Sequence, residues 1–183
     1  MRITIGLFLL FGLITDGMTD DFRSLPWGTS MDDIIEAEGE PSVTEKDCVR
    51  YTDSAAERPA VVIYCADENE GLYRGTYQFT VAHGTAYRRY LDDFSDVQTR
   101  LTARYGEPTA AGAQWSDPRL RGPRTHWPFR LAEGALSLRA EWRLEDRHII
   151  QVLEKDIDGN GLIRHFVRYE NPTAHRVMLG RDL

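Results

Sequence analysis

The chain has 183 residues, 42% of them hydrophobic, which is enough apolar material for one domain or for two small, closely packed ones. Its formal net charge is −7 at pH 7. That charge argues against a nucleic-acid partner, because phosphate binding requires a concentrated basic surface, and it has the wrong sign for attraction to anionic lipids.

The N-terminal stretch differs from everything that follows it. Arg2 precedes twelve uncharged, mostly apolar residues, 3–14. A helix needs about 20 residues to cross roughly 30 Å of hydrocarbon, so this run is too short to span a bilayer. It matches the apolar region of a signal peptide, and we predict a signal peptide over residues 1–18, a periplasmic or secreted protein, and no stable membrane insertion after its removal. A short membrane anchor and a buried first strand are the alternatives.

A short helix is predicted after Ser30, whose hydroxyl can cap its first turn. Its apolar face consists of Met31, Ile34 and Ile35. Gly39-Glu40-Pro41 ends it, because proline cannot continue a helix. Three strands are predicted next, and strict alternation of apolar and polar residues in the third indicates a sheet with one wet face. They cover residues 47–52, 60–66 and 73–81.

The two cysteines, Cys48 and Cys65, lie on the first two of these strands. If the strands form a hairpin in which Thr52 pairs with Val61, Cys48 lies opposite Cys65. In an oxidising compartment such a pair forms a disulfide, which stabilises the fold by roughly 3 kcal/mol for a loop of about this size. Two buried free thiols are the alternative.

A longer helix is predicted from an apolar stripe with steps of three and four residues. The stripe consists of Tyr90, Phe94, Val97, Leu101 and Tyr105. Gly106-Glu107-Pro108 ends this helix. An exposed loop is predicted over 118–128, and strands are predicted over 136–144, 147–155 and 162–169.

Both helices stop in the same tripeptide, 67 residues apart, and strands follow each time. We therefore predict an α+β fold made of two tandem helix–antiparallel β-meander halves that pack as one unit. The halves cover residues 19–86 and 87–171, and residues 172–183 form a C-terminal tail.

The segment 22–30, with its Pro26-Trp27-Gly28 step into a helix and the Gly-Glu-Pro stop, resembles the opening of many bacterial envelope proteins. The tandem helix-plus-sheet pattern resembles the β-lactamase inhibitor protein and the small outer-membrane assembly lipoproteins. This resemblance implies a fold and a cell-envelope compartment. It assigns no functional residue, and the acylated cysteine of the lipoproteins is missing from this sequence.

The sharpest local motif runs from Asp156 to Ile163. Oxygen-bearing residues at its first, third and fifth positions and a glycine at the sixth follow the first two-thirds of a calcium-binding loop. The predicted metal residues are Asp156, Asp158, Asn160 and Leu162. Val167 stands where such loops carry a bidentate glutamate, so calcium affinity would be weak. Because Asp-Gly and Asn-Gly also favour hairpin turns, a plain turn is the alternative.

No motif for catalysis stands out in the sequence: the five histidines have no metal spacing, and no serine lies in a nucleophile elbow. Aromatic residues exceed what a small core needs, and aromatics with arginine supply the hot spots of protein interfaces. The predicted binding surface consists of Trp115, Arg119, Arg121, Trp127, Arg139 and Arg143. The alternative is that the aromatics fill the core and the arginines only solubilise the surface.

These patterns predict an exported, non-catalytic binding module that recognises another envelope or secreted protein, as an accessory or an inhibitor. A calcium-dependent structural domain and a hydrolase with a noncontiguous site are the alternative functions.

Overall fold

The computed structural model describes residues 21–156 and 160–174. The predicted signal peptide, Asp158 of the predicted calcium loop and most of the predicted tail lie outside the described residues. Within the described ranges, no helix is both long enough and apolar enough to cross a membrane.

The described chain is a mixed α+β fold, as predicted. Its helices are α1 (Met31–Glu38), α2 (Tyr87–Tyr105) and α3 (Trp127–Glu133), and two 3-10 turns, η1 (Pro118–Leu120) and η2 (Arg124–His126), precede α3. The strands are β1 (Val43–Glu45), β2 (Cys48–Ala55), β3 (Arg58–Asp67), β4 (Gly71–Phe79), β5 (Ala110–Trp115), β6 (Leu136–Arg143), β7 (His148–Lys155) and β8 (Ile163–Glu170).

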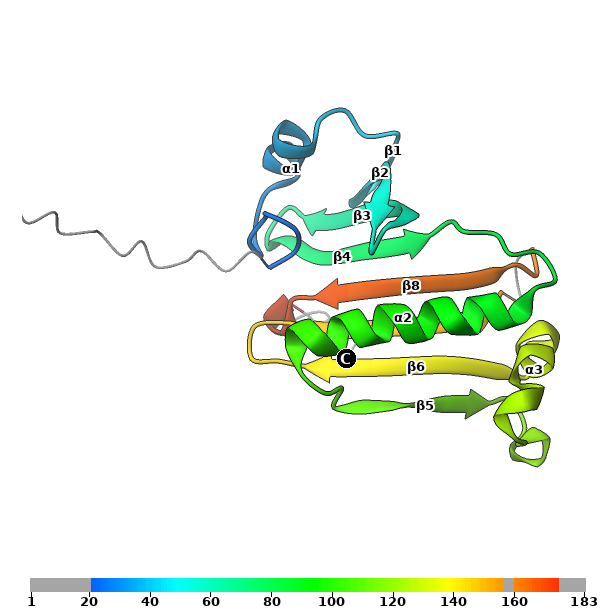
Figure 1. Ribbon diagram of the computed structural model, residues 1–183. Coiled ribbons are helices and arrows are strands. Elements are labelled where there is room, and N and C mark those ends of the chain that lie inside the picture. The colour runs from blue at the N-terminus through cyan, green and yellow to red at the C-terminus, as the bar shows by residue number, and fades with distance from the viewer. Residues whose placement is uncertain (1–20, 157–159, 175–183) are drawn as a thin grey trace, which may run out of the picture.

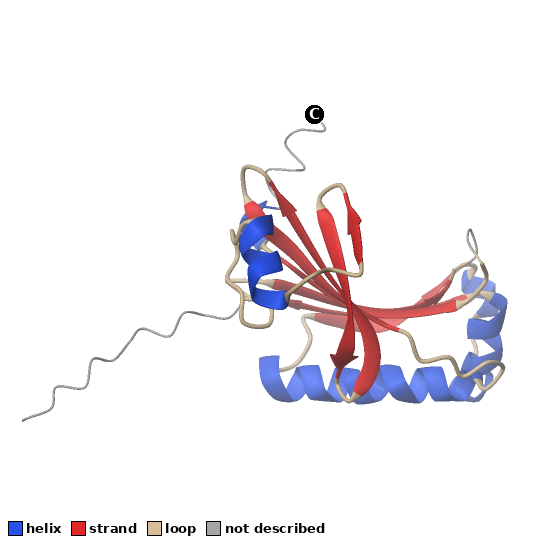
Figure 2. Cartoon of the chain, turned by 90° about the horizontal axis from the view of Figure 1, so that it is seen from above, coloured by secondary structure: helices blue, strands red, loops and turns tan. Residues whose placement is uncertain are grey.

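The strands form one eight-stranded sheet in the order β1-β2-β3-β4-β8-β7-β6-β5, and every neighbouring pair is antiparallel. Two runs of consecutive strands, β1–β4 and β5–β8, therefore meet where β4 pairs with β8 (Figure 1). Figure 2 shows how strongly the sheet twists, with α2 along one face and α3 beside one end of that helix.

Helix α2 lies across strands of the second run and buries the predicted apolar stripe. The side chains of Tyr90, Phe94, Val97 and Leu101 are buried, and Tyr105 is half-buried. Helix α1 packs on β3 at the same face, where the Tyr64 hydroxyl donates a hydrogen bond to Glu38 of α1 over 2.5 Å. Both helices thus cover one face of the sheet, because period-two alternation places the large apolar side chains there.

Helix α1 begins, and both α1 and α2 end, where the sequence predicts. Asp33 N donates to the Ser30 hydroxyl at the start of α1, over 3.2 Å. Gly39 and Gly106 follow the last residues of α1 and α2, each with positive φ, 87° and 82°, a conformation that glycine adopts at little cost. Each glycine N–H donates to the carbonyl four residues earlier, over 2.9 Å.

The predicted hairpin register is confirmed. Thr52 pairs with Val61 and Cys48 pairs with Cys65, and the two cysteines form a disulfide. The register of the ladder thus places the two cysteines opposite each other, as the disulfide requires.

Phe22 anchors the segment before α1 to the seam between β4 and β8. Its ring packs against Tyr64, Tyr77 and Tyr169 with centroid separations of 5.0–5.4 Å and is 1% exposed. A Cβ at Gly75 would come within 2.2 Å of that ring, so glycine is required there for steric reasons. The aromatic opening segment thus completes the core.

The predicted exposed loop over 118–128 is wrong in part, because these residues form η1, η2 and the start of α3. A proline fits in the first turn of a helix, where its missing N–H would have no partner, and Pro128 lies in the first turn of α3. Gly134, in the left-handed conformation, ends that helix. Strand β5 has no counterpart among the predicted strands, since its alanine-rich sequence carries little β preference of its own.

Candidate binding surface

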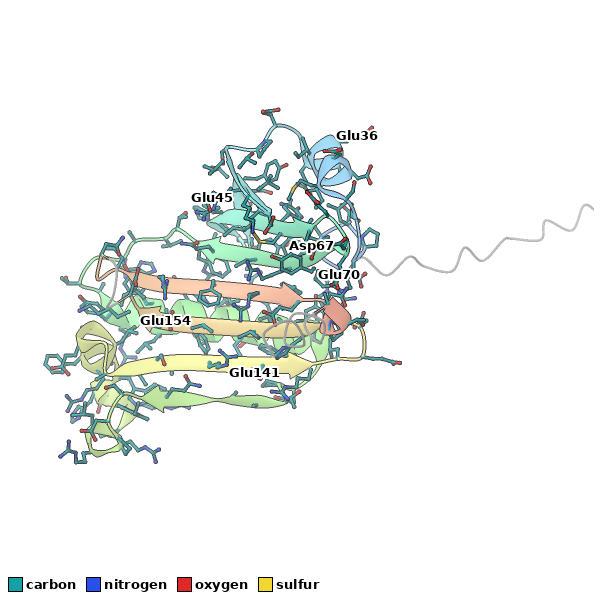
Figure 3. All side chains as sticks on the ribbon, turned by 180° about the vertical axis from the view of Figure 1, so that it is seen from behind. Glu36, Glu45, Asp67, Glu70, Glu141 and Glu154 are labelled. Atoms are coloured by element: carbon teal, nitrogen blue, oxygen red, sulfur yellow. A yellow bond between two sulfur atoms is a disulfide. The ribbon has the colours of Figure 1, made fainter. Side chains whose placement is uncertain are left out.

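The face of the sheet opposite α1 and α2 carries most of the charged strand residues. Figure 3 shows Glu45, Glu141 and Glu154 on it. We call this surface the arginine face, and its charged members are Glu45, Arg50, Arg74, Arg139, Glu141, Arg143, Glu154, Arg164, Arg168 and Glu170. In this set arginines outnumber glutamates, although the whole chain has a net charge of −7.

Each glutamate of the arginine face binds at least one arginine. Three of these ion pairs are Arg50–Glu45 at 2.7 Å, Arg164–Glu154 at 2.6 Å and Arg168–Glu170 at 2.8 Å. Partly exposed pairs of this kind contribute about 0–1 kcal/mol each. Fold stability therefore does not explain why so many arginines gather on this face.

Glu141 lies in the middle of a cluster on β6 and β7. It accepts hydrogen bonds from Arg139 at 2.6 Å and Arg143 at 3.2 Å, and His148 Nε2 lies 3.5 Å away. The hydrogen bond from Arg139 is the main reason why the pKa of the Glu141 carboxyl is held below its ordinary value. Glu141 is thus a fixed negative charge that orients both arginines.

A pocket of about 340 Å³ opens at the other end of the arginine face. Its apolar lining comprises Ile63, Phe166 and the Cys48–Cys65 disulfide. Four arginines from three strands surround this lining: Arg50, Arg74, Arg164 and Arg168. Glu45 also lines the pocket, which thus joins an apolar floor to a rim where arginines outnumber carboxylates.

Arg74 is the arginine of this pocket whose charge is least compensated. Its Nη2 lies 3.2 Å from the Sγ of Cys65 and 3.9 Å from that of Cys48, and its guanidinium lies 5.6 Å from the ring centroid of Tyr73. Among the described residues, no carboxylate forms an ion pair with Arg74. Sulfur and an aromatic face are weak partners for a cation compared with a carboxylate, so the Arg74 charge remains available to a ligand.

The structure divides the predicted binding surface among three places. Its members are Trp115, Arg119, Arg121, Trp127, Arg139 and Arg143. The two tryptophans pack edge to face, with centroids 6.3 Å apart, on the helix-covered side of the sheet. Arg139 and Arg143 lie on the arginine face. Arg119 and Arg121 lie at η1, where Arg119 forms an ion pair with Asp117 at 2.6 Å.

Sequence reasoning missed the four arginines of the pocket. Each alternates with apolar residues in a predicted strand, which was the available signal for a shared wet face. The pairing of β4 with β8 sets Arg74 opposite Glu170 and Thr76 opposite Arg168, and it thereby brings Arg74 and Arg168, from strands far apart in the sequence, into one pocket.

Asp156, Asn160 and Leu162 of the predicted calcium loop lie in the connection between β7 and β8. Asp156 N donates to the carbonyl of Leu162 at 2.8 Å, and Leu162 N donates to Asn160 Oδ1 at 3.0 Å. In the described ranges no cluster of three or more histidine, cysteine or acidic residues could hold a metal ion. Because Asp158 is not described, calcium binding stays a prediction.

The hydrolase alternative requires an acid–base pair, and His83 Nε2 lies 2.6 Å from Asp93 Oδ2. Arg58 binds the other oxygen of Asp93, at 3.1 Å, and the backbone N–H of His83 donates to the Tyr90 hydroxyl. These contacts join the segment before α2 to β3 and to the helix. Neither His83 nor Asp93 lines the pocket of the arginine face.

No known family model matches the sequence, and no curated protein is significantly similar to it. Among solved structures, the chain is similar to a DUF4309 family protein, YjgB, from Bacillus subtilis, with 13% identity and a TM-score of 0.41 over 78% of each chain. The resemblance to the β-lactamase inhibitor protein and to the assembly lipoproteins stays a prediction.

Proposed function

We propose that this chain is an exported, non-catalytic binding module that recognises another protein through its arginine face. The observation that carries the proposal is Arg74, a cation without a carboxylate partner among the described residues, in a pocket lined by three further arginines. A partner with an acidic, partly apolar protrusion fits this pocket, because the rim would bind its carboxylates while Ile63 and Phe166 contact its apolar part.

Charge distribution supports recognition of an acidic partner. The arginine face carries excess positive charge on an acidic chain, and such segregation accelerates the encounter with a partner of opposite potential. Arginine suits this role better than lysine, since its planar guanidinium binds carboxylates through two parallel hydrogen bonds. No calcium and no catalytic group enters the proposal.

The proposed compartment is the periplasm or the extracellular space. The disulfide supports this assignment, because disulfides persist in oxidising environments. The apolar run over 3–14 supports it independently, as a signal peptide.

We also propose that the halves 19–86 and 87–171 descend from one helix–meander unit. The support is that α1 and α2 end in the same glycine geometry, that each precedes four strands, and that the two runs of strands meet edge to edge at β4 and β8. Two such units joined at one edge bury a continuous core beneath both helices.

Affinity capture from native envelope extract tests the proposed function. The bait is the exported chain, and its variants are Arg74→Glu and Arg168→Glu on the arginine face. Arg89→Glu is the matched control, because Arg89 is exposed on α2 and the charge change is the same. We expect one stoichiometric protein to be recovered with the wild type and the control, and at least tenfold less with either arginine-face variant. Equal recovery with all four baits would refute a role for the arginine face.

A further inference from the structure

Strand β5 leaves one edge of the sheet open. It is the last strand in the sheet order, and among the described residues nothing pairs with its outer side. Ser116 N donates to the carbonyl of Ala135, and this bond shows which backbone groups of β5 face β6: those of Ser116 and of every second residue before it. Because every second residue of an antiparallel strand bonds to its neighbour, Ala111, Ala113 and Trp115 turn their N–H and C=O groups outward.

This edge lacks the features that usually protect a free strand. Proteins prevent unwanted pairing by short edge strands, charged side chains, proline or bulges. The opposite edge, β1, has three residues and includes Glu45, so it is both short and charged. Strand β5 has six residues, Ala-Ala-Gly-Ala-Gln-Trp, with no charge and no proline.

A groove of about 340 Å³ runs beside this edge, between β5 and α2. The small side chains of Ala111 and Ala113 leave its floor open, and Leu91 and Trp127 provide apolar walls. The groove therefore has room for the side chains of an added strand.

The charges in the groove select the occupant. Arg88 and Arg124 line it together with one carboxylate, Asp92, while Arg139, which also borders it, is bound to Glu141 on the arginine face. The guanidinium of Arg124 lies over the Trp127 ring, 5.2 Å from its centroid, and within the described chain neither Arg88 nor Arg124 forms an ion pair. A second copy of this chain would bring the same arginines to the groove, and two chains of net charge −7 repel each other. An acidic peptide would instead complement the arginines of the groove and pair with the edge.

We propose that β5 binds an extended acidic segment of the partner protein as a ninth strand, with alternate side chains in the groove between β5 and α2. Backbone hydrogen bonds to Ala111 and Ala113 supply sequence-independent affinity, and Arg88 with Arg124 selects an acidic residue. This inference rests on the proposed function, since it requires a protein partner, but it uses a surface separate from the arginine-lined pocket over the disulfide.

The probe is a library of random octapeptides displayed on phage and selected against the folded chain. Selected peptides are synthesised and titrated into the isotope-labelled chain, and NMR follows backbone amide shifts and hydrogen exchange. We expect enriched peptides to be acidic, and the amide protons of Ala111 and Ala113 to be protected on binding.

Substitutions in the edge and the groove separate strand addition from binding elsewhere. Ala111→Pro removes an outward N–H and leaves the ladder to β6 intact, so we expect at least a tenfold loss of affinity. Ala111→Ser keeps that N–H and should change affinity less than twofold. Arg88→Glu and Arg124→Glu, both at exposed positions, should each weaken acidic peptides at least fivefold.

Three outcomes would overturn the inference: no peptide is enriched, the enriched peptides bind Ala111→Pro as well as wild type, or the wild-type chain dimerises in sedimentation experiments while Ala111→Pro stays monomeric. The last result would assign β5 to a second copy. If these peptides fail while the arginine-face variants still abolish capture, strand addition alone is refuted. If peptides bind as expected while capture is insensitive to Arg74→Glu, the proposed role of the arginine face in partner recognition is refuted.

Discussion

The indole Nε1 of Trp142 on β6 donates a hydrogen bond to the carbonyl of Gly106, 2.9 Å away, at the end of α2. Tyr51 on β2 makes the corresponding contact, with its hydroxyl 3.0 Å from the carbonyl of Gly39 at the end of α1. Carbonyls at the end of a helix have no partner inside the helix. In both cases an aromatic residue from the second strand after the helix supplies that partner and fixes the helix end on the sheet.

Substitution of Trp142 and of Tyr51 should lower the free energy of unfolding by different amounts. Trp142→Phe removes a hydrogen bond and leaves a cavity at a side chain that is 1% exposed, so the free energy of unfolding should fall by about 2–4 kcal/mol. Tyr51→Phe removes only a hydroxyl and should cost about 1 kcal/mol. Urea denaturation of both variants measures the difference. A loss below 1 kcal/mol for Trp142→Phe would contradict its role in the core.

Gly75 in β4 and Gly112 in β5 should respond differently to an added methyl group. Gly75→Ala pushes a Cβ into the Phe22 ring, and overpacking of this kind costs about 1–3 kcal/mol. Gly112→Ala is the matched control, because its Cβ meets open space, and should stay within about 0.5 kcal/mol of wild type. Thermal unfolding of the pair checks this, and equal melting temperatures would show that Phe22 is not held against Gly75.

Loss of the disulfide should lower stability without changing the fold. The bridge links cysteines 17 residues apart, and a loop of that size corresponds to about 3 kcal/mol. Cys48→Ala/Cys65→Ala should therefore unfold at lower denaturant concentration, with the β2–β3 register kept. Wild type in the presence of reductant is the control and should match the double variant. If both behave like the oxidised wild type, the covalent bond contributes nothing beyond the hairpin.

His165 should make the fold sensitive to mild acid. Burial beneath α2 lowers the pKa of its imidazole from 6.5 to about 3, and Gln151 Nε2 lies 3.1 Å from its Nε2. Between pH 6.5 and about pH 3, the His165 imidazole of the unfolded chain binds a proton that the folded chain excludes. The free energy of unfolding should therefore be highest above pH 6.5 and decrease as the pH falls toward 3, by up to about 1.4 kcal/mol per pH unit.

His165→Phe tests the source of that pH dependence. The ring contacts Phe79 and Phe94, with centroids 4.6 and 5.7 Å away, so phenylalanine fits this aromatic site in shape. Denaturant titrations at a series of pH values should show a flatter profile between pH 6.5 and pH 4 in the variant. Identical slopes for the two proteins would assign the pH dependence to other groups.

Calcium should leave the chain unchanged if the Asp156–Leu162 connection is a plain turn. Asp156 N and Leu162 O already bond to each other at 2.8 Å, and Gly161, with φ of 71°, supplies the turn conformation. We expect no heat in titration calorimetry and no shift in melting temperature at millimolar calcium. A rise in melting temperature that Asp156→Asn abolishes would instead establish the calcium-dependent alternative.

Most of the local structure followed from the sequence. The caps at Ser30, Gly39 and Gly106, the buried stripe of α2 and the Cys48–Cys65 register are all determined by neighbours in the chain or by a single hairpin. Strand β5 was missed, because its alanines and glycine become a strand through pairing with β6 rather than through their own preference. The helical turns before Gly134 were missed because prolines favour both loops and helix starts.

The sequence alone thus determined α1, α2, most of the strands, their alternating faces and the disulfide, since each depends on residues that are close in the chain. Tertiary structure alone decided which polar strand faces join. The pairing of β4 with β8 brings Arg74 and Arg168 into one pocket, and the sheet order leaves β5 at one edge. Pairing between distant strands depends on the whole core, including the fit of Phe22 over Gly75, so no local pattern can specify it.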